Sequence, residues 1–304
     1  MRCKTPLFFL VCIILSLSSP SCREDHVQKV GDEKIRVIAS LFPLYDFARE
    51  ISRQRAEVIL MLPPGVEPHS FEPKPGDILA LQKADIFVYM GRAMEPWAEG
   101  LLRGVRNEKL LIVDVSKGIV TDTRGPDDMD PHLWLDFSYA RKMVDAILEA
   151  LLIKNGENRE FYIQNASSYK ERLADLDRRY RATLEHCERR IFLHGGHFAF
   201  NYLARRYGLN YLSAYKGFSP DTEPTPRDIA ELIKNLRDQG LHHIFYEELI
   251  NPRVAETISR ETGASLLKLN GAHNVTREEK GKGVTFITLM DENLQNLAIG
   301  LRCR

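Results

Sequence analysis

The sequence has no excess of either charge, and this limits the partners that the protein can have. It contains 42 basic and 42 acidic residues, and neither a basic patch nor an RNA-binding motif stands out. Because nucleic-acid binding relies on clustered lysine and arginine side chains, we expect no nucleic-acid partner. Beyond the amino terminus the sequence also has no apolar run approaching the about 20 residues that a membrane span needs.

The one marked apolar run, residues 7–17, follows two basic residues and precedes a group of small residues. This order is typical of an export signal, so we expect residues 1–22 to be a signal peptide and the polar residues 23–34 to be a tether. Cys22 is either a lipid-attachment site or lies next to an ordinary cleavage point near Ser21. The residue three positions before Cys22 is not aliphatic, which departs from the usual lipidation pattern.

Cysteine is scarce, and its distribution suggests at most one disulfide. Five cysteines are present, of which Cys22, Cys187 and Cys303 remain after the signal is removed. If Cys22 carries lipid, the other two are an even pair in an oxidising compartment. They either form a disulfide that pins the carboxyl terminus, with a gain on the order of 4 kcal/mol, or remain two buried thiols.

The roughly 280 residues that remain suit two domains of ordinary size. Short apolar runs alternate with amphipathic stretches along most of the chain. We expect strands at 35–40, 58–62, 85–90, 110–115, 191–194, 211–215, 243–247 and 266–269. We expect helices at 44–53, 77–83, 97–102, 137–152, 199–207, 226–238, 252–262 and 284–301. This alternation favours an α/β fold with parallel sheets.

One long charged stretch, residues 160–190, contains neither glycine nor proline. Apolar residues recur in it at steps of three and four, at Tyr162, Ala166, Tyr169, Leu173, Leu176, Tyr180 and Leu184. The pattern predicts a helix of about 28 residues, or roughly 42 Å, which is long enough to link two domains. We therefore predict two lobes, 35–155 and 191–304, each with a parallel sheet flanked by helices. One rigid helix within 156–190 joins them.

Three histidines lie in stiff segments that are far apart in the sequence. His69 lies between two prolines, His132 follows a proline, and His197 follows two glycines. Imidazole is the commonest protein ligand for zinc-like metals, and a rigid loop can hold it within the tolerance of a metal bond. We expect these side chains to meet at one metal ion in a cleft between the lobes. Taken singly, each also fits a turn histidine or a buried, hydrogen-bonded one.

The neighbours of these histidines leave several alternatives open. Of the two histidines that flank the glycines, we expect His197 to reach the metal and His194 to pack. One of the carboxylates near His132 is expected to orient its ring, although Asp136 could instead cap the following helix. The fourth metal position falls to His273, to an oxygen of Asn270, or to water, because residues 267–274 contain no carboxylate.

At these segments the chain resembles the substrate-binding proteins of zinc and manganese ABC importers, the cluster A-I metal-binding lipoproteins. The resemblance extends from Arg36 to Leu301. It is carried by the segments 64–77, 130–136, 197–208, 223–233 and 286–294. It implies two α/β lobes joined by a rigid helix, with His69, His132 and His197 as ligands. The family usually has an aspartate at the position of Asn270, and many zinc-specific members have a histidine-rich loop before His132 that this chain lacks.

The resemblance implies an extracytoplasmic protein that captures Zn²⁺ and delivers it to the membrane permease of an ABC transporter. Members that bind manganese tend to have glutamate in place of His197, so we expect Zn²⁺ first and Mn²⁺ or iron second. We expect a monomer, not an enzyme, in the periplasm or at the outer face of the cytoplasmic membrane, held to it only through a lipid at Cys22. The alternatives are a surface adhesin lipoprotein and a zinc hydrolase, although the sequence has no His-Glu-x-x-His motif.

Overall fold

The computed structural model describes residues 34–119, 129–220, 223–247 and 249–304. The expected signal peptide, Cys22 and nearly all of the tether lie outside the described residues, as does most of the short stretch before His132. None of the helices in the described part of the chain is both long enough and apolar enough to span a membrane.

The first lobe is built on a parallel sheet with the strand order β2-β1-β3-β4. Its strands are β1 (Ile35–Ala39), β2 (Ala56–Leu60), β3 (Ile86–Tyr89) and β4 (Leu111–Asp114). In the register, Val37 lies opposite both Val58 and Ile86, which places β1 in the interior of the sheet. The accompanying helices are α1 (Phe42–Ser52), α2 (Pro75–Leu81), α3 (Ala98–Arg103) and α4 (Phe137–Lys154).

The second lobe repeats this strand arrangement, with the order β6-β5-β7-β8 and all neighbours parallel. Its strands are β5 (Ile191–His194), β6 (Asn210–Ser213), β7 (His243–Tyr246) and β8 (Ser265–Lys268). Its helices are α6 (Asn201–Arg206), α7 (Pro226–Asp238), α8 (Arg253–Thr262), α9 (Arg277–Gly281) and α10 (Phe286–Gly300). The predicted fold class is confirmed. Helix α9 was not predicted, because five residues are too few for a periodic apolar pattern.

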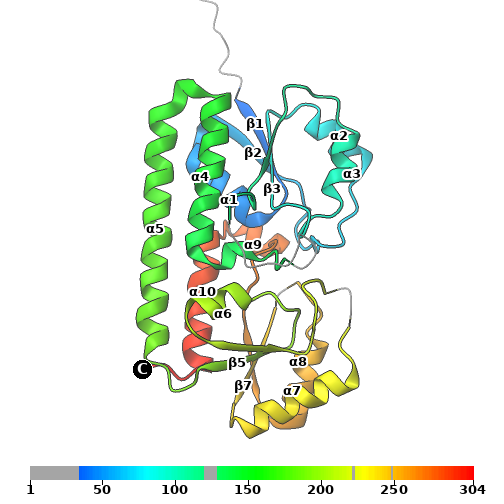
Figure 1. The fold of residues 1–304 in the computed structure, drawn as a ribbon, viewed down its shortest axis with the longest axis vertical. Coiled ribbons are helices and arrows are strands. Elements are labelled where there is room, and N and C mark those ends of the chain that lie inside the picture. Colours follow the sequence, from blue (N-terminus) through cyan, green and yellow to red (C-terminus); the bar gives the residue numbers. More distant parts are fainter. Residues whose placement is uncertain (1–33, 120–128, 221–222, 248) are drawn as a thin grey trace, which may run out of the picture. The chain divides into compact units, whose positions relative to one another are not determined.

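The long helix α5 (Arg159–Glu185) runs past both sheets, as Figure 1 shows. Its 27 residues bury the seven side chains that the three- and four-residue spacing had marked, from Tyr162 to Leu184. The helix ends at Glu185, earlier than residue 190. The reason is that Cys187 leaves the helical path and forms an antiparallel bridge and a disulfide with Cys303. The disulfide alternative for these two cysteines is therefore the one that the structure shows.

A continuous hydrophobic core runs along α5 and reaches into both lobes. It includes Val37 of β1, Phe192 of β5 and Leu297 of α10, all of which are buried. Asp46, which is fully buried on α1, binds two other elements in this core. Its carboxylate accepts hydrogen bonds from the Phe286 backbone N–H, at 3.0 Å, and from the Tyr169 hydroxyl, at 3.2 Å. The start of α10 is thereby held by the first lobe.

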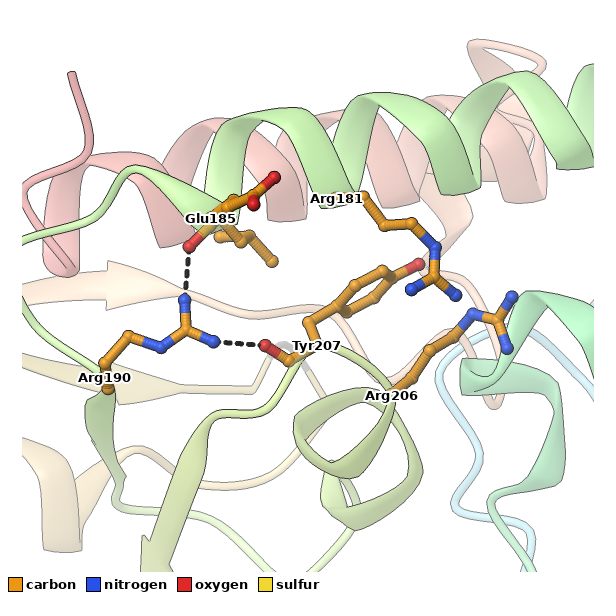
Figure 2. Close-up of a pocket in the computed structure, with 6 residues that line it drawn as sticks. Arg181, Glu185, Arg190, Arg206 and Tyr207 are labelled. Atoms are coloured by element: carbon orange, nitrogen blue, oxygen red, sulfur yellow. Dashed lines mark hydrogen bonds between the residues drawn. The ribbon is translucent and has the colours of Figure 1, made fainter.

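A second polar contact joins α6 to α4 and α5 through Arg206. The guanidinium donates to both carboxylate oxygens of Asp177, at 2.8 and 2.6 Å, and to Asp136, at 2.8 Å. Burial alone would raise the pKa of Asp177, but hydrogen bonds from Arg206 and Tyr207 and the nearby charges lower it. Figure 2 shows Arg206 beside the surface pocket of about 380 Å³ that is lined by Arg181, Leu184, Glu185, Arg190, Arg206 and Tyr207.

We expect the substitution Arg206→Ala to lower the free energy of unfolding of the metal-free protein by about 3 kcal/mol, because two largely buried carboxylates, Asp136 and Asp177, lose the cation that they share. Arg181→Ala is the matched control. Arg181 is more exposed and lies 3.5 Å from Asp177, so its loss should cost less than about 1 kcal/mol. Urea denaturation followed by circular dichroism measures both values. Equal losses in the two variants would contradict this account of the contact.

Candidate metal centre

Four histidines reach the centre from four separate segments. His69, His197 and His273 each lie in a loop that follows a strand, namely β2, β5 and β8. His132 precedes the short 3₁₀ turn Leu133–Leu135 that leads into α4. Ligands of open parallel sheets bind beyond the carboxyl ends of the strands, so the location agrees with the fold.

The loop that carries His69 is held in place by an aromatic pair. The Trp97 indole donates a hydrogen bond of 2.9 Å to the carbonyl of Pro68, next to the histidine. The ring of Phe71 packs edge-on against Trp97, with 5.0 Å between the ring centroids. His69 itself is 9% exposed, which makes it the least buried of the four. It is thus the member of the cluster closest to solvent.

A carboxylate orients His132, as expected, and it is Asp130. One oxygen of Asp130 accepts both the ring Nδ1–H, at 2.8 Å, and the backbone N–H of His132, at 3.1 Å. This arrangement leaves Nε2 as the nitrogen that is available for a metal. Asp136 instead caps the amino terminus of α4, where its side chain accepts a hydrogen bond from the backbone N–H of Ser138.

Glu247 does the same for His197. One oxygen of Glu247 accepts the backbone N–H, at 2.7 Å, and the ring Nδ1–H, at 2.8 Å. Gly196 allows this approach, since a Cβ there would lie 2.0 Å from the same oxygen. His194 packs against Phe200 instead, with ring centroids 4.9 Å apart, and its Nδ1 accepts from the Gly196 N–H. The expectation that His197 rather than His194 points to the centre agrees with this geometry.

The fourth imidazole is that of His273. Its Nε2 is buried and has no hydrogen-bond partner among the described residues. Gly271 leaves room for the ring, because a Cβ at this position would lie 2.3 Å from it. Asn270 has a structural role: its side-chain oxygen accepts from the Ala272 N–H, and its backbone exchanges hydrogen bonds with Asn293. The oxygen of Asn270 is therefore already in use.

Together the four side chains form one compact cluster. One nitrogen of each of His69, His132, His197 and His273 lies within 4.8 Å of all the others. The two Nε2 atoms of His132 and His197 are 3.1 Å apart. A tetrahedral zinc ion with Zn–N bonds of about 2.0–2.1 Å needs nitrogens roughly 3.3 Å apart. A small rearrangement of the four rings, in which His132 and His197 move slightly apart, would create this geometry.

The charge states of the cluster favour binding of a cation, because an imidazole must be neutral to bind a metal. Burial, aided by the neighbouring imidazoles, lowers the pKa of His132 and of His273 well below the usual range, so both rings are neutral at pH 7. Burial also opposes charge on His197, but Glu247 outweighs it and raises the pKa of His197. Burial raises the pKa of Asp130 to about 7, although its hydrogen bonds lower it. A bound divalent ion would favour the ionised forms of both carboxylates.

Two residues of the centre were not identified from the sequence. The sequence analysis placed Glu247 at the end of the strand 243–247. An acidic residue at the carboxyl end of a parallel strand was the signal that could have identified it as part of a site. Trp134 is fully buried and contacts two of the histidines edge-on, with centroid distances of 5.5 Å to His132 and 5.3 Å to His273. Nothing in the local sequence connects Trp134 to His273, which lies far along the chain.

The chain is similar to known zinc-uptake and zinc-binding proteins in sequence and in structure. The family described as zinc-uptake complex component A, periplasmic (ZnuA), matches residues 37–300. The high-affinity zinc uptake system protein ZnuA of Bacillus subtilis is 33% identical over 299 residues, which cover 94% of this chain and 93% of that protein. The zinc-binding lipoprotein AdcA of Streptococcus pneumoniae is 31% identical over 284 residues, and the match covers 89% of this chain but only 56% of AdcA.

Solved structures agree with these sequence relationships. The zinc-bound ZnuA-like domain of Streptococcus pneumoniae AdcA superimposes with a TM-score of 0.77 at 31% identity, covering 88% of this chain and 99% of that domain. The laminin-binding protein of Streptococcus agalactiae, described as bifunctional with adhesin and metal transporting activity, gives 0.80 at 29% identity, covering 88% and 100%. By its sequence and its fold, the chain belongs to the ZnuA family of zinc-uptake components.

Proposed function

We propose that the protein captures Zn²⁺ outside the cytoplasmic membrane and delivers it to the permease of an ABC transporter. The observation that carries the proposal is the cluster of His69, His132, His197 and His273, whose nitrogens lie within 4.8 Å of one another. Membership of the ZnuA family supports the transport role. The localisation, the lipid at Cys22, the monomeric state and the lobe boundaries 35–155, 156–190 and 191–304 remain part of this proposal.

The donor set favours zinc over manganese. Four imidazoles suit zinc, whereas manganese prefers carboxylate and carbonyl oxygens. Four neutral ligands do not compensate the charge of the ion, but Asp130 and Glu247 each lie one hydrogen bond behind a ligand. Two carboxylates at this distance can balance a divalent cation without entering its coordination shell.

The same geometry argues against a hydrolase. A catalytic zinc site keeps one coordination position for water and places a general base beside it. Four imidazoles would complete the coordination of a tetrahedral zinc ion and leave no such position. We therefore propose a binding protein rather than an enzyme.

A zinc titration of the purified protein, read by competition with a chelating dye, tests the binding role. We expect one tightly bound Zn²⁺ per chain and much weaker binding of Mn²⁺. Uptake is tested by deletion of the gene, which should impair growth in zinc-depleted medium and be corrected by added zinc. Preference for manganese, or normal growth without the gene, would contradict the proposal.

Adhesion is a second candidate, because the laminin-binding protein of Streptococcus agalactiae has a similar fold and is described as bifunctional. Adsorption of the purified chain to immobilised laminin tests it. The His132→Ala variant separates the two roles: adhesion that does not depend on the metal would persist in this variant, whereas zinc binding would not.

A further inference from the structure

The segment 271–275, which carries His273, belongs to the second lobe by sequence but is bound to the first lobe. The Trp134 indole donates a hydrogen bond of 2.8 Å to the carbonyl of Gly271. The backbone N–H of Phe42 donates to the carbonyl of His273 at 3.1 Å, and that of Gly65 donates to the carbonyl of Val275 at 2.9 Å. All three donors lie before residue 155, so the first lobe holds both sides of this histidine.

Asn274 adds a side-chain contact between the two histidine loops that the backbone bond from Gly65 to Val275 also joins. Its amide Nδ2 donates to the carbonyls of Pro63, at 2.7 Å, and Val66, at 3.0 Å, in the loop that leads to His69. Its side-chain oxygen accepts from the Val275 N–H at 2.8 Å. Asn274 is fully buried, so its truncation removes both hydrogen bonds and leaves a gap between the two loops. Together with the backbone bond from Gly65 to Val275, the side chain therefore sets the spacing between the His69 loop and the His273 segment.

His197 is held by the second lobe instead. Glu247 accepts its backbone and ring N–H groups, and the Tyr211 hydroxyl donates to its carbonyl at 2.9 Å. His197 meets the histidines of the first lobe through its Nε2, which lies 3.1 Å from the Nε2 of His132. The first lobe thus holds three of the four imidazoles and the second lobe holds one. In the sequence, by contrast, two of the histidines precede α5 and two follow it.

We propose that Asn274 is a positioning residue of the zinc site. It fixes the His273 segment to the His69 loop, so that His69, His132 and His273 form a three-imidazole face on the first lobe, which His197 completes from the second lobe. This inference rests on the proposed function, because it requires zinc at these histidines. It predicts that loss of the Asn274 amide disturbs two ligands at once without removing either.

The test compares Asn274→Ala with Asn296→Ala in the full mature chain. Asn296 is the matched control, because its amide also donates to a backbone carbonyl, that of Lys268, at 2.8 Å, but within the second lobe. We expect Asn274→Ala to bind Zn²⁺ about 10- to 100-fold more weakly than the wild type, in the range of other residues that orient metal ligands. We expect Asn296→Ala to bind it unchanged.

Co²⁺ serves as a spectroscopic probe of ligand geometry. The visible absorption of bound Co²⁺ should change in intensity and position in Asn274→Ala and match the wild type in Asn296→Ala. A purely structural role would lower the melting temperature of the metal-free protein without altering this spectrum. If Asn274→Ala does not fold, Asn274→Ser takes its place, because its hydroxyl keeps a polar atom at this position but has one donor and cannot bind both Pro63 and Val66.

The outcomes separate this inference from the proposed function. Failure of the wild type to bind Zn²⁺ would refute the function itself. Tight binding by the wild type, together with unchanged Zn²⁺ affinity and an unchanged Co²⁺ spectrum in Asn274→Ala, would overturn the positioning role alone. If Asn274→Ser is the variant that folds, the same result in it would overturn that role.

Discussion

Replacement of His132 by alanine is expected to lower the affinity for Zn²⁺ by at least about 100-fold. Protein sites built from four ligands bind zinc with about 10–16 kcal/mol, or about 3 kcal/mol for each ligand, and each 1.4 kcal/mol changes the affinity tenfold. His132 is fully buried and has its Nδ1 fixed by Asp130, so no neighbouring group can easily take its place. Calorimetry with a competing chelator measures the change.

His242→Ala is the matched control for this substitution. His242 is an exposed histidine in the second lobe, outside the cluster, and its loss should leave zinc binding unchanged. Circular dichroism of the metal-free variants shows whether both remain folded. Retention of tight binding by a folded His132→Ala protein would remove the metal centre as described, and with it the proposed function.

Glu247→Gln is the second substitution with a large expected effect, although Glu247 is not among the four proposed ligands. Glutamine keeps the size of the side chain but removes the negative charge behind His197. Loss of such a partner typically weakens metal binding about 10- to 100-fold. The exposed Glu256 on α8 is the control, and Glu256→Gln should bind zinc like the wild type. A competition titration at neutral pH measures both.

The pH dependence of binding separates this role of Glu247 from simple packing. Glu247 raises the pKa of His197 against the effect of burial, so in the wild type a proton competes with zinc for this ring. Affinity should therefore fall about tenfold per pH unit once the pH drops below that raised pKa. In Glu247→Gln the two largest effects that raise the pKa of His197 are lost, and burial, which lowers it, outweighs the smaller effects of Glu67 and Asp130. The fall in affinity should therefore begin at a lower pH. An unchanged onset in the variant would contradict this role.

The sequence alone predicted the features that depend on neighbours along the chain. The apolar spacing from Tyr162 to Leu184 predicted α5 and its buried face, since residues three and four apart share one side of a helix. The alternation of apolar runs and amphipathic stretches predicted both parallel sheets. Three stiff segments each carrying a histidine were enough to predict a metal centre, and the scarcity of cysteine left one pair that could join.

Only the tertiary structure decided how the ligands are held. Glu247 lies 50 residues from His197 and Asn274 lies more than 200 residues from Pro63, yet each pair shares a hydrogen bond. Local sequence carries no signal for such pairs, because the two partners become neighbours only when the tertiary fold brings distant parts of the chain together. For the same reason the sequence placed His273 with the second lobe, whereas the hydrogen bonds from Trp134, Phe42 and Gly65 tie it to the first.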